Sequence, residues 1–304
     1  MYIDKGILSV VLERKAKLDS LRPLDASTLK RLRDELTVEM TYNSNSIEGN
    51  TLSQSETRMV LEDGITVGGK TMREHLEVTN HKCAMDRLES LVSKSEIEIV
   101  DILNLHALIL DRIDHSNAGS YRIGRVYISG SSFIPPKPSA LPDMMKEFVR
   151  MFNLKPEIAV EQAALLHMEF VNMHPFTDGN GRTARLLLNL HLMRNGYPPI
   201  VIKKVDRRRY IDAIVSSQSK GDHSPFVNFI AVYLVQALDL RIDAFSSEPK
   251  EYISIAEASK RSGYSQGHLS LLAKKGRIPA RKFGRNWKVA INDMERYMRK
   301  RYGD

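Results

Sequence analysis

The sequence is poor in the features that would place it outside the ordinary globular class. It holds one cysteine, Cys83, in 304 residues, which excludes an intramolecular disulfide framework. Hydrophobic residues make up 42% and charged residues 27% of the chain. Disorder, collagen and a coiled coil are therefore excluded as descriptions of the whole chain. At about 150 residues per domain, this length predicts two or three domains.

Long apolar runs are also missing. Met1 to Ser9 contains Asp4 and no apolar core, so we expect no secretory signal. The most apolar long stretch, Phe226 to Leu240, is interrupted by polar residues. We predict that it is too short and too polar to span a bilayer. The expected location is a reducing cytoplasm, and a membrane is not an expected partner.

Positive charge is in excess, and the excess is local. There are 45 Lys plus Arg against 37 Asp plus Glu, a formal net charge of +8. Residues 1–250 contain 32 basic and 32 acidic residues, whereas residues 251–304 contain 13 basic and 5 acidic ones. The whole excess therefore lies in the C-terminal tail. Nucleic acid or another anionic partner is expected there rather than on the body of the protein.

Apolar residues recur at three- and four-residue spacing along most of the chain to about residue 245, which predicts an all-helical body. The clearest stretches are Leu29 to Met40, Ile97 to Leu110, Ile158 to Val171, Thr183 to Met193 and Pro225 to Leu240. Tyr121 to Phe133 differs, because glycines stand among residues that favour β-structure. It is predicted to be a short β-hairpin flap that ends at Pro135-Pro136. Phe245 to Lys250 has the composition of a linker.

The most informative stretch runs from His174 to Arg185, between one apolar helix and the next. Its Gly-Asn-Gly run at 179–181 tolerates left-handed backbone, so successive N–H groups can turn inward as an anion-binding nest. The following helix, predicted to start near Arg182, adds its positive N-terminal end. Arg182 and Arg185 are three residues apart and share one face of the first turn. The stretch therefore suits a polyphosphate.

Two further side chains of this stretch suit phosphate chemistry. Asp178 is a lone carboxylate beside the predicted nest, and proteins usually hold Mg²⁺ in this way because substrate phosphates supply other ligands. His174 has an unperturbed pKa of about 6.5, which suits a general base. Each residue alone also fits a structural role in a turn or a helix cap. Their density favours a site, because a turn needs neither two arginines nor the histidine. The other histidines show no metal spacing and are predicted to be structural or surface residues.

The stretch resembles the signature of the Fic family, His-x-Phe-x-(Asp/Glu)-Gly-Asn-Gly-Arg-x-x-Arg. Every specified position matches, namely His174, Phe176, Asp178, Gly179, Asn180, Gly181, Arg182 and Arg185. The likeness extends over roughly residues 40 to 240. It implies a Fic-fold helical bundle that transfers AMP from ATP to a Ser, Thr or Tyr hydroxyl of a target protein or of the chain itself.

The resemblance implies a role for each matching residue. His174 would deprotonate the target hydroxyl, and Asp178 would hold Mg²⁺ against the α- and β-phosphates of ATP. Residues 179–181 would cradle these phosphates and Arg182 would add positive charge. Arg185 would hold the γ-phosphate.

The resemblance also covers residues beside the reacting groups. Phe176 would anchor the loop in the core. Relatives that act as kinases carry Lys where this chain has Gly181, so glycine favours nucleotidyl transfer. An exposed strand edge on the flap would dock an extended target segment by main-chain hydrogen bonds; an ordinary surface hairpin is the alternative. The flap residues proposed for docking are Val126, Tyr127, Ile128 and Phe133.

A second motif, Ser44-Asn-Ser-Ile-Glu-Gly49, lies upstream and by itself reads as a helix end with Gly49 as the stop signal. Beside the signature it resembles the family's inhibitory motif, (Ser/Thr)-x-x-x-Glu-(Gly/Asn), with Ser44, Glu48 and Gly49 in place. The resemblance implies that Glu48 pairs with Arg185, takes the fork that the γ-phosphate needs, and restrains the enzyme in cis. In some family members this glutamate helps to remove AMP, and the sequence leaves that role open.

Residues 252–304 are predicted to form a separate small domain. Ser254 is expected to cap a helix over Ile255 to Lys260, and Ser265 a second helix over Gln266 to Lys274. Ala280 to Val289 alternates as a two-stranded wing does, and Asn292 to Arg301 is predicted to be a last helix. The run from residue 253 to residue 280 resembles the winged helix-turn-helix domains of excisionase and MerR-type proteins.

Such domains place the second helix in the major groove of duplex DNA and the wing on the backbone. The candidate contacts are Gln266, His268, Ser270 and Lys274 on the helix and Arg281, Lys282, Arg285 and Lys288 on the wing. The alternative is a helical interaction module whose basic face is merely solvated.

The predicted organisation is an N-terminal helical region with the inhibitory helix over residues 1–105, a Fic catalytic core over 106–245, a linker over 246–251 and a winged helix over 252–304. The predicted function is protein adenylylation restrained by Glu48. The alternative is a DNA-binding regulator whose Fic fold senses nucleotide. The resemblance also makes a homodimer plausible.

Overall fold

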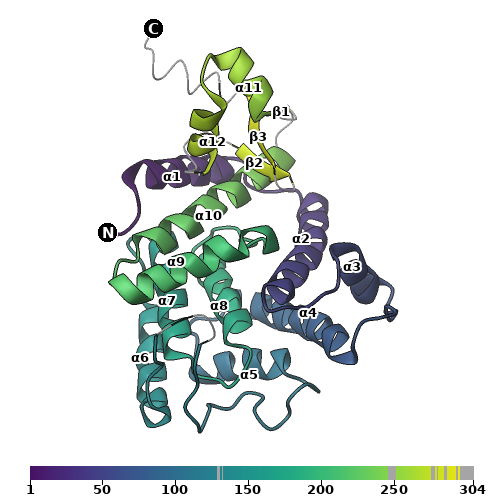
Figure 1. The fold of residues 1–304 in the computed structure, drawn as a ribbon, viewed down its shortest axis with the longest axis vertical. Helices are drawn as coiled ribbons and strands as arrows, with labels where there is room; N and C mark the ends of the chain where they lie inside the picture. The colour runs from purple at the N-terminus through teal and green to yellow at the C-terminus, as the bar shows by residue number, and fades with distance from the viewer. Residues whose placement is uncertain are drawn as a thin grey trace. The chain divides into compact units, whose positions relative to one another are not determined.

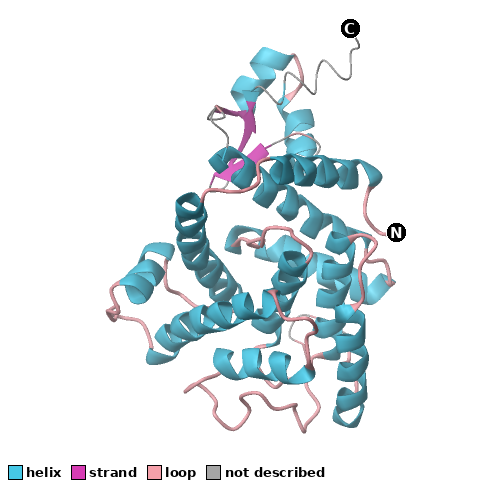
Figure 2. Ribbon diagram, turned by 180° about the vertical axis from the view of Figure 1, so that it is seen from behind, coloured by secondary structure: helices cyan, strands magenta, loops and turns pink. Residues whose placement is uncertain are grey.

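The computed structural model describes residues 1–128, 131, 133–245, 251–274, 278, 280–283, 286–291 and 294. The chain divides into two compact units: one is Arg31–Phe226, and the other joins Met1–Lys30 to the part that follows Phe226. Helices dominate, and the strands of the described part all lie near its C-terminal end (Figures 1 and 2). The predicted helical body with a small C-terminal sheet is confirmed. The predicted domain boundaries stay a prediction.

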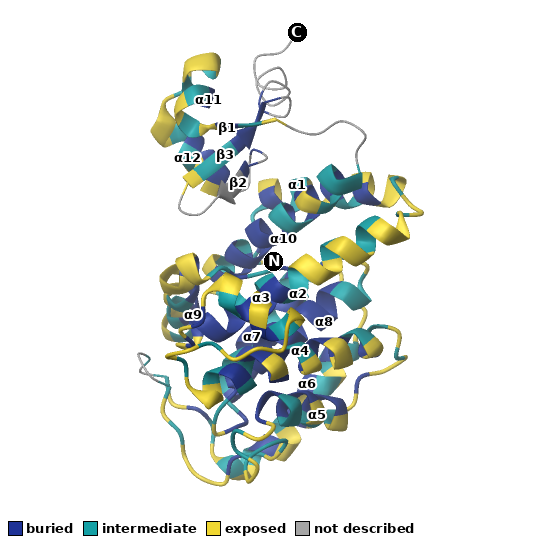
Figure 3. Cartoon of the chain, turned by 90° about the vertical axis from the view of Figure 1, so that its right-hand side faces the viewer, coloured by how far each residue is buried: buried dark blue, intermediate teal, exposed yellow. Residues whose placement is uncertain are grey.

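The unit Arg31–Phe226 is built around one helix. Its helices are α2 (Ala26–Ile47, from Arg31 on), α3 (Gln54–Glu62), α4 (Met72–Val92), α5 (Ile99–Ile109), α6 (Leu141–Asn153), α7 (Ala159–Met173), α8 (Asn180–Arg194) and α9 (Arg207–Lys220). Helix α8 packs against α4, α5 and α7, and α7 also packs against α6. Nearly all of α8 is buried (Figure 3), and the buried residues include the polar side chains of Arg182, Arg185 and Asn189 as well as its leucines. Because Arg182 and Arg185 lie on α8, its position sets theirs.

Local sequence explains where these helices begin and end. A capping box of Ser53 and Glu56 starts α3, and one of Thr71 and Glu74 starts α4, so side chains satisfy the orphan N–H groups of each first turn. Gly49, with φ +108°, follows the end of α2, which confirms the predicted stop. Helix α4 was not among the clearest predicted stretches, because part of its buried face is polar. The buried polar residues of α4 are His75, Asn80 and His81.

The flap segment is a loop rather than a hairpin. Among its described residues, 121–128, 131 and 133–137, none is in a strand, so the β-hairpin prediction was wrong for these positions. The physical reason lies at the base of the loop, where the carbonyl oxygens of Gly124 and Pro136 accept hydrogen bonds from the Arg122 side chain instead of from a facing strand. The hairpin tip predicted at residues 129, 130 and 132 lies outside the described residues.

The other unit contains α1 (Lys5–Ser20) and most of α10 (Ser224–Phe245). Asp4 caps α1 by accepting from the N–H groups of Gly6 and Ile7. A buried ion pair joins the two helices, with Arg14 Nε 2.9 Å from Asp239 Oδ1. The pairing offsets the cost of burying both charges.

Within the described part of the chain, α10 is the helix that is long and apolar enough to cross a membrane by length and composition. The prediction that this stretch is too short and too polar was wrong on that count. However, 67% of its most apolar window is buried inside the protein. Core helices pass the same test, so its length is weak evidence for a membrane.

The C-terminal elements follow the prediction closely. Helix α11 (Ile255–Ser262) is capped by Ser254, and α12 spans Gln266–Lys274 with Ser265 Oγ accepting from the N–H of His268. Strands β2 (Ala280–Phe283) and β3 (Asn286–Ala290) pair antiparallel as the wing. A third strand, β1 (Tyr252–Ser254), pairs with β3 and was not predicted. The last predicted helix falls mostly outside the described residues.

Candidate active site

The loop that joins α7 to α8 holds the motif. His174 follows α7 in left-handed backbone, with φ +46°, and its N–H donates to the carbonyl of Phe170 over 3.0 Å. Gly179, with φ +78°, is the residue before α8. The Asn180 side chain bonds both main-chain groups of Phe176, donating over 2.8 Å and accepting over 3.0 Å. The side chain of Asn180 therefore closes the loop, and what it can offer a ligand is its backbone N–H.

The ring of His174 is held in the form that a base needs. Its Nδ1 lies 3.3 Å from the carbonyl oxygen of Val171. Since a carbonyl only accepts, Nδ1 carries the hydrogen of the neutral ring and Nε2 keeps a free lone pair. Burial lowers the pKa of His174 below its usual value of 6.5, although the Val171 carbonyl opposes this effect. The imidazole is therefore neutral at pH 7.

His106 of α5 supports the loop from beneath. Its ring stacks on the fully buried Phe176, with centroids 3.6 Å apart and planes within 4°. Because Nδ1 accepts the N–H of Gly119 over 3.0 Å, Nε2 carries the hydrogen and donates to the carbonyl of Asp178 over 2.9 Å. Burial lowers the pKa of His106 to about 4, so the ring stays neutral. A Cβ at Gly179 would lie 3.2 Å from this ring, and glycine therefore permits the close approach.

His106 is among the histidines predicted to be structural or surface residues, and nothing in the sequence connects it with the motif. It lies 72 residues from Asp178, and no spacing pattern links the two. Helical periodicity predicts its burial in α5, but only the folded chain shows which carbonyl it contacts.

Arg122 ties the loop to the flap. Its Nε donates to the carbonyl of His174 over 2.8 Å, and its two Nη atoms donate to the carbonyls of Gly124 and Pro136 over 2.9 and 2.6 Å. Its own N–H donates to the carbonyl of Pro175 over 3.0 Å. The residue is 3% exposed. It forms no ion pair with any described residue, and burial lowers its pKa. The Arg122 guanidinium thus connects both ends of the flap to His174.

We expect Arg122→Ala to destabilise the fold by about 1–3 kcal/mol, because it leaves three partly buried carbonyls without their charged donor. Any activity that depends on His174 should fall further than stability alone explains, since the flap and His174 lose their common support. Arg122→Lys keeps the charge but not the fork, so it should rescue little. Denaturant unfolding would measure the loss of stability, and an assay of that activity would measure the second effect. Arg125→Ala, at an exposed neighbouring residue, is the control. Equal losses of stability and activity in both alanine variants would show that Arg122 does not hold the flap and His174 together.

Asp178 lies within a cluster of charges at the start of α8. Its Oδ1 accepts from the Gly179 N–H over 2.6 Å and lies 3.3 Å from Arg182 Nη2, and its Oδ2 accepts from Arg73 of α4 over 2.8 Å. Although burial raises it, Arg182, the Gly179 N–H and Arg73 hold the pKa of Asp178 below its usual value. Arg73 was not predicted as a site residue.

Arg182 is a buried cation with donors to spare. The residue is 2% exposed, and its Nε and Nη1 have no hydrogen-bond partner in the described part of the chain. The nearest acid to Nη1 is Glu77 of α4, with 3.5 Å between Nη1 and Oε1. Because unmet buried donors cost free energy, this arrangement favours an anion next to Arg182.

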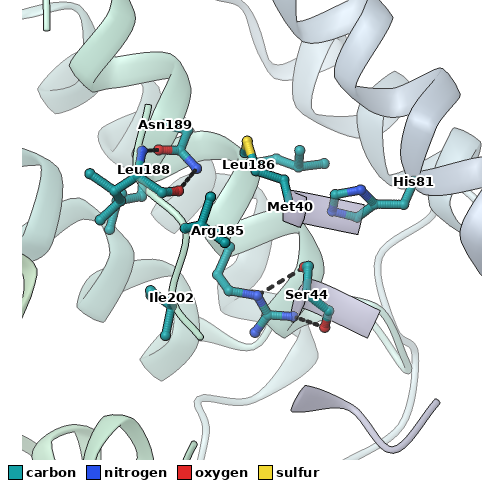
Figure 4. Close-up of a pocket in the computed structure, with 10 residues that line it drawn as sticks. Met40, Ser44, His81, Arg185, Leu186, Leu188, Asn189 and Ile202 are labelled. Carbon is teal, nitrogen blue, oxygen red and sulfur yellow. Dashed lines mark hydrogen bonds between the residues drawn. The ribbon is translucent and has the colours of Figure 1, made fainter. Parts of the chain in front are cut away.

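Arg185 is engaged by the end of α2. Its Nη2 donates to Glu48 Oε1 over 2.8 Å and to the carbonyl of Ser44 over 2.9 Å, while Nε donates to Ser44 Oγ over 3.0 Å. The two bonds to Ser44 appear in Figure 4. The structure thus brings Glu48 and Ser44 together with Arg185, 137 and 141 residues away. Gly49 follows as the turn that ends the helix.

The structure gives a second reason for glycine at position 181. A Cβ at this position would lie 2.3 Å from Glu48 Oε1, which no real contact allows, so any other side chain would push the glutamate away. Glycine at 181 is therefore required for the Glu48 position as seen.

A small cavity lies beside Arg185 (Figure 4). It measures about 20 Å³, and its lining includes Met40, Ser44, His81 and Asn189. Burial lowers the pKa of His81 to about 3, helped by Arg185 and Arg182. A space of this size holds about one water molecule, so it is not the nucleotide site.

The flap presents apolar side chains to solvent. Tyr127 is 81% exposed, and Ile123 and Ile134 on the same loop are also exposed. Of the other predicted docking residues, Val126, Ile128 and Phe133 are half-buried. Apolar groups exposed beside a catalytic loop are suited to contact a target segment.

The predicted DNA contacts divide into those that the structure places and those that it does not. Gln266 and Lys274 are exposed on α12, whereas His268 and Ser270 are half-buried, the former against Tyr264 at 5.1 Å between ring centroids. Gln266, Ser270 and Lys274 share one face at four-residue spacing. On the wing, Lys288 is half-buried in β3, and Arg281 and Lys282 lie in β2 without described side chains. Arg285 lies outside the described residues.

Comparison with known families matches residues 96–192 to the Fic/DOC family and residues 252–302 to a helix-turn-helix domain. Among curated proteins, the protein adenylyltransferase Fic of Drosophila melanogaster is 39% identical over 254 residues, which cover 82% of this chain and 51% of the relative. The chain thus spans about half the length of the curated relatives that it matches.

Solved structures give the same grouping. Fic-1 from C. elegans has a TM-score of 0.72 and 35% identity, and the match covers 79% of this chain and 72% of that one. A Fic domain containing signaling protein from Bacteroides thetaiotaomicron has a TM-score of 0.70 and 31% identity, and the match covers 80% of this chain and all of that one.

Proposed function

Because the chain belongs to the Fic/DOC family, we propose that it is a protein adenylyltransferase, which transfers AMP from ATP to a Ser, Thr or Tyr hydroxyl of a protein. The fold matches that of the family, and its curated relatives are named for this activity. The observation that carries the proposal is the placing of a neutral His174, with Nε2 free, at the other end of the loop from two buried arginines.

The chemistry follows from these groups. Nε2 of His174 takes the proton of the target hydroxyl. At the same time the hydroxyl oxygen bonds to the α-phosphorus of ATP, and pyrophosphate leaves. The spare donors of Arg182 face the charge that develops on the phosphates, and the backbone N–H groups at the start of α8 add to them. Positioning and charge neutralisation should supply most of the acceleration. The base should contribute about 10²–10⁴-fold.

Asp178 fits Mg²⁺ in its donor chemistry. A lone, partly exposed carboxylate at a phosphate-binding loop suits an ion that keeps several waters and takes further oxygens from the nucleotide. The described residues hold no group of three or more His, Cys, Asp or Glu that could bind a metal ion, so water and the nucleotide would supply most of the ligands. When bound, the ion would neutralise phosphate charge.

We also propose that Glu48 restrains the enzyme. The fork of Arg185 that would hold the γ-phosphate is already bonded to Glu48 and Ser44. ATP must therefore displace a carboxylate or bind in a pose that leaves its γ-phosphate elsewhere.

Transfer from labelled ATP tests the proposed activity. Protein from a cell lysate, or the chain itself, should become labelled from α-labelled ATP and not from γ-labelled ATP when the Glu48→Gly variant is used. Label from γ-labelled ATP would show kinase chemistry. Absence of label from either would favour the second candidate, a DNA-binding regulator in which the Fic fold senses nucleotide.

We propose that the C-terminal domain binds duplex DNA, and the match to a helix-turn-helix domain favours this reading. Affinity should fall with salt at a slope of about −0.9 per neutralised phosphate. Lys274→Ala should weaken binding and reduce the slope by about 0.9. Lys260→Ala, an exposed lysine on α11, serves as the control. DNA binding that is independent of salt, or equal effects of the two substitutions, would overturn the proposal. The C-terminal domain would then be a helical interaction module whose basic face is merely solvated.

We also propose that a target segment docks on the flap loop through Tyr127 and its half-buried neighbours. A cytoplasmic location is proposed from the low cysteine content, and a homodimer is proposed from the likeness to the family.

A further inference from the structure

The carboxylate proposed to hold Mg²⁺ is already occupied by a cation from another helix. Arg73, in the first turn of α4, donates Nη2 to Asp178 Oδ2 over 2.8 Å. The Arg73 side chain is 57% exposed, whereas that of Arg182, on the other oxygen, is 3% exposed. One of the two cations can therefore swing into solvent, and the other cannot.

The position of Arg73 is built into the fold. Glu77, one turn further along α4, lies 3.3 Å from Arg73 Nε and 3.5 Å from Arg182 Nη1, both measured from Oε1. Its second oxygen accepts from Asn50 Nδ2 over 2.9 Å. Glu77 thus orients both arginines toward Asp178. The cluster carries two positive and two negative charges, so it is neutral before any ligand arrives.

A divalent cation at Asp178 would upset this balance. It needs the lone pairs that Arg73 occupies, and it repels the guanidinium. Arg73 is the exposed partner and must leave. The phosphates of the nucleotide would arrive with the metal and offer it new acceptors, since a guanidinium fork suits phosphate oxygens.

We propose that Arg73 is an exchangeable counter-ion of Asp178: it blocks the metal-binding carboxylate in the nucleotide-free protein and moves to the phosphates of the metal–ATP complex. The proposal rests on the proposed function, because it uses Asp178 as the metal ligand. It makes entry of metal without nucleotide unfavourable, so that the ion and ATP enter together.

The test measures binding rather than turnover. Binding of Mn²⁺ alone, followed by electron paramagnetic resonance, should become about two- to fivefold tighter in Arg73→Ala, since an exposed competing ion pair is lost. In the Glu48→Gly background, affinity for a fluorescent ATP analogue with Mg²⁺ should become weaker by a similar factor. Arg73→Lys keeps the charge but not the fork, so it should lie between the wild type and Arg73→Ala in both assays. Arg58→Ala, in an exposed ion pair with Glu62 on α3, should change neither.

The variants separate the inference from the assignment beneath it. Asp178→Ala should abolish Mn²⁺ binding. If it binds Mn²⁺ as the wild type does, the metal assignment fails and the inference fails with it. If Asp178→Ala loses Mn²⁺ but Arg73→Ala binds it no more tightly, the metal site stands and Arg73 is not its competitor. If Arg73→Ala leaves nucleotide affinity unchanged, the exchange onto phosphates is overturned.

Discussion

Glu48→Gly should raise AMP incorporation, both into the chain itself and into targets, by about 10- to 100-fold at subsaturating ATP. The estimate follows from the bond that is removed: a charge-assisted hydrogen bond to Arg185 contributes about 1.5–3 kcal/mol, and each 1.4 kcal/mol changes an equilibrium tenfold. Arg185 keeps its two bonds to Ser44, so the fork stays in place while its competitor is gone.

The same change should also lower stability. Glu48 lies after the end of α2 at Ile47 and its side chain is 39% exposed, but its partner Arg185 is buried. Loss of the charge-assisted hydrogen bond to Arg185 should therefore cost about 1.5–3 kcal/mol. Glu48→Gln is the matched variant, because it keeps the shape and one acceptor but loses the charge, and it should activate less than glycine does. Unchanged incorporation in Glu48→Gly, with ATP binding intact, would show that the contact with Arg185 does not restrain catalysis.

His174→Ala should lower AMP transfer by about 10²–10⁴-fold when introduced into the Glu48→Gly protein. ATP affinity should hardly change, since the proposed phosphate ligands all lie from Asp178 onward. The loss therefore belongs in kcat rather than in KM. Retention of transfer with an intact pH profile would show that another group takes the proton.

The pH dependence has a definite sign. The base works only when neutral, and burial lowers the pKa of His174 below 6.5. Transfer by the Glu48→Gly protein should therefore be level around pH 7 and decline as the pH falls through this lowered pKa. In His174→Ala this acid limb should vanish, because the group that titrates is gone. A plot of log kcat/KM against pH for both proteins checks the assignment.

The motif could be recognised from the sequence because its residues lie close together in the chain. Eight specified positions within residues 174–185 made a phosphate site more plausible than a turn. Periodicity and capping serines placed α12 at its observed bounds, because local signals decide short helices. The contact between Glu48 and Arg185 could be predicted only through the resemblance to a family, because neither residue's sequence surroundings indicate its partner.

The supporting residues could not be predicted for a related reason. Arg122, His106 and Arg73 each reach the motif loop through a hydrogen bond to a backbone or carboxylate oxygen that is 52, 72 or 105 residues away, respectively. Their sequence neighbourhoods fit ordinary helix and loop positions. The flap failed as a hairpin because Arg122, rather than a partner strand, supplies donors to its end carbonyls. Such pairings depend on how helices pack, which periodicity does not specify.

The burial of α8 has a consequence for how restraint and stability are divided. Arg182 and Arg185 sit on a helix enclosed by three others, so these anion-binding groups belong to the part of the molecule that opens only when the whole unit unfolds. Glu48 follows the end of α2 and its side chain is 39% exposed, so this side chain can leave Arg185 without the unfolding of a helix. In the proposed restraint, control would therefore be gained or lost by the movement of one side chain, while the arginines that it controls remain as durable as the fold itself.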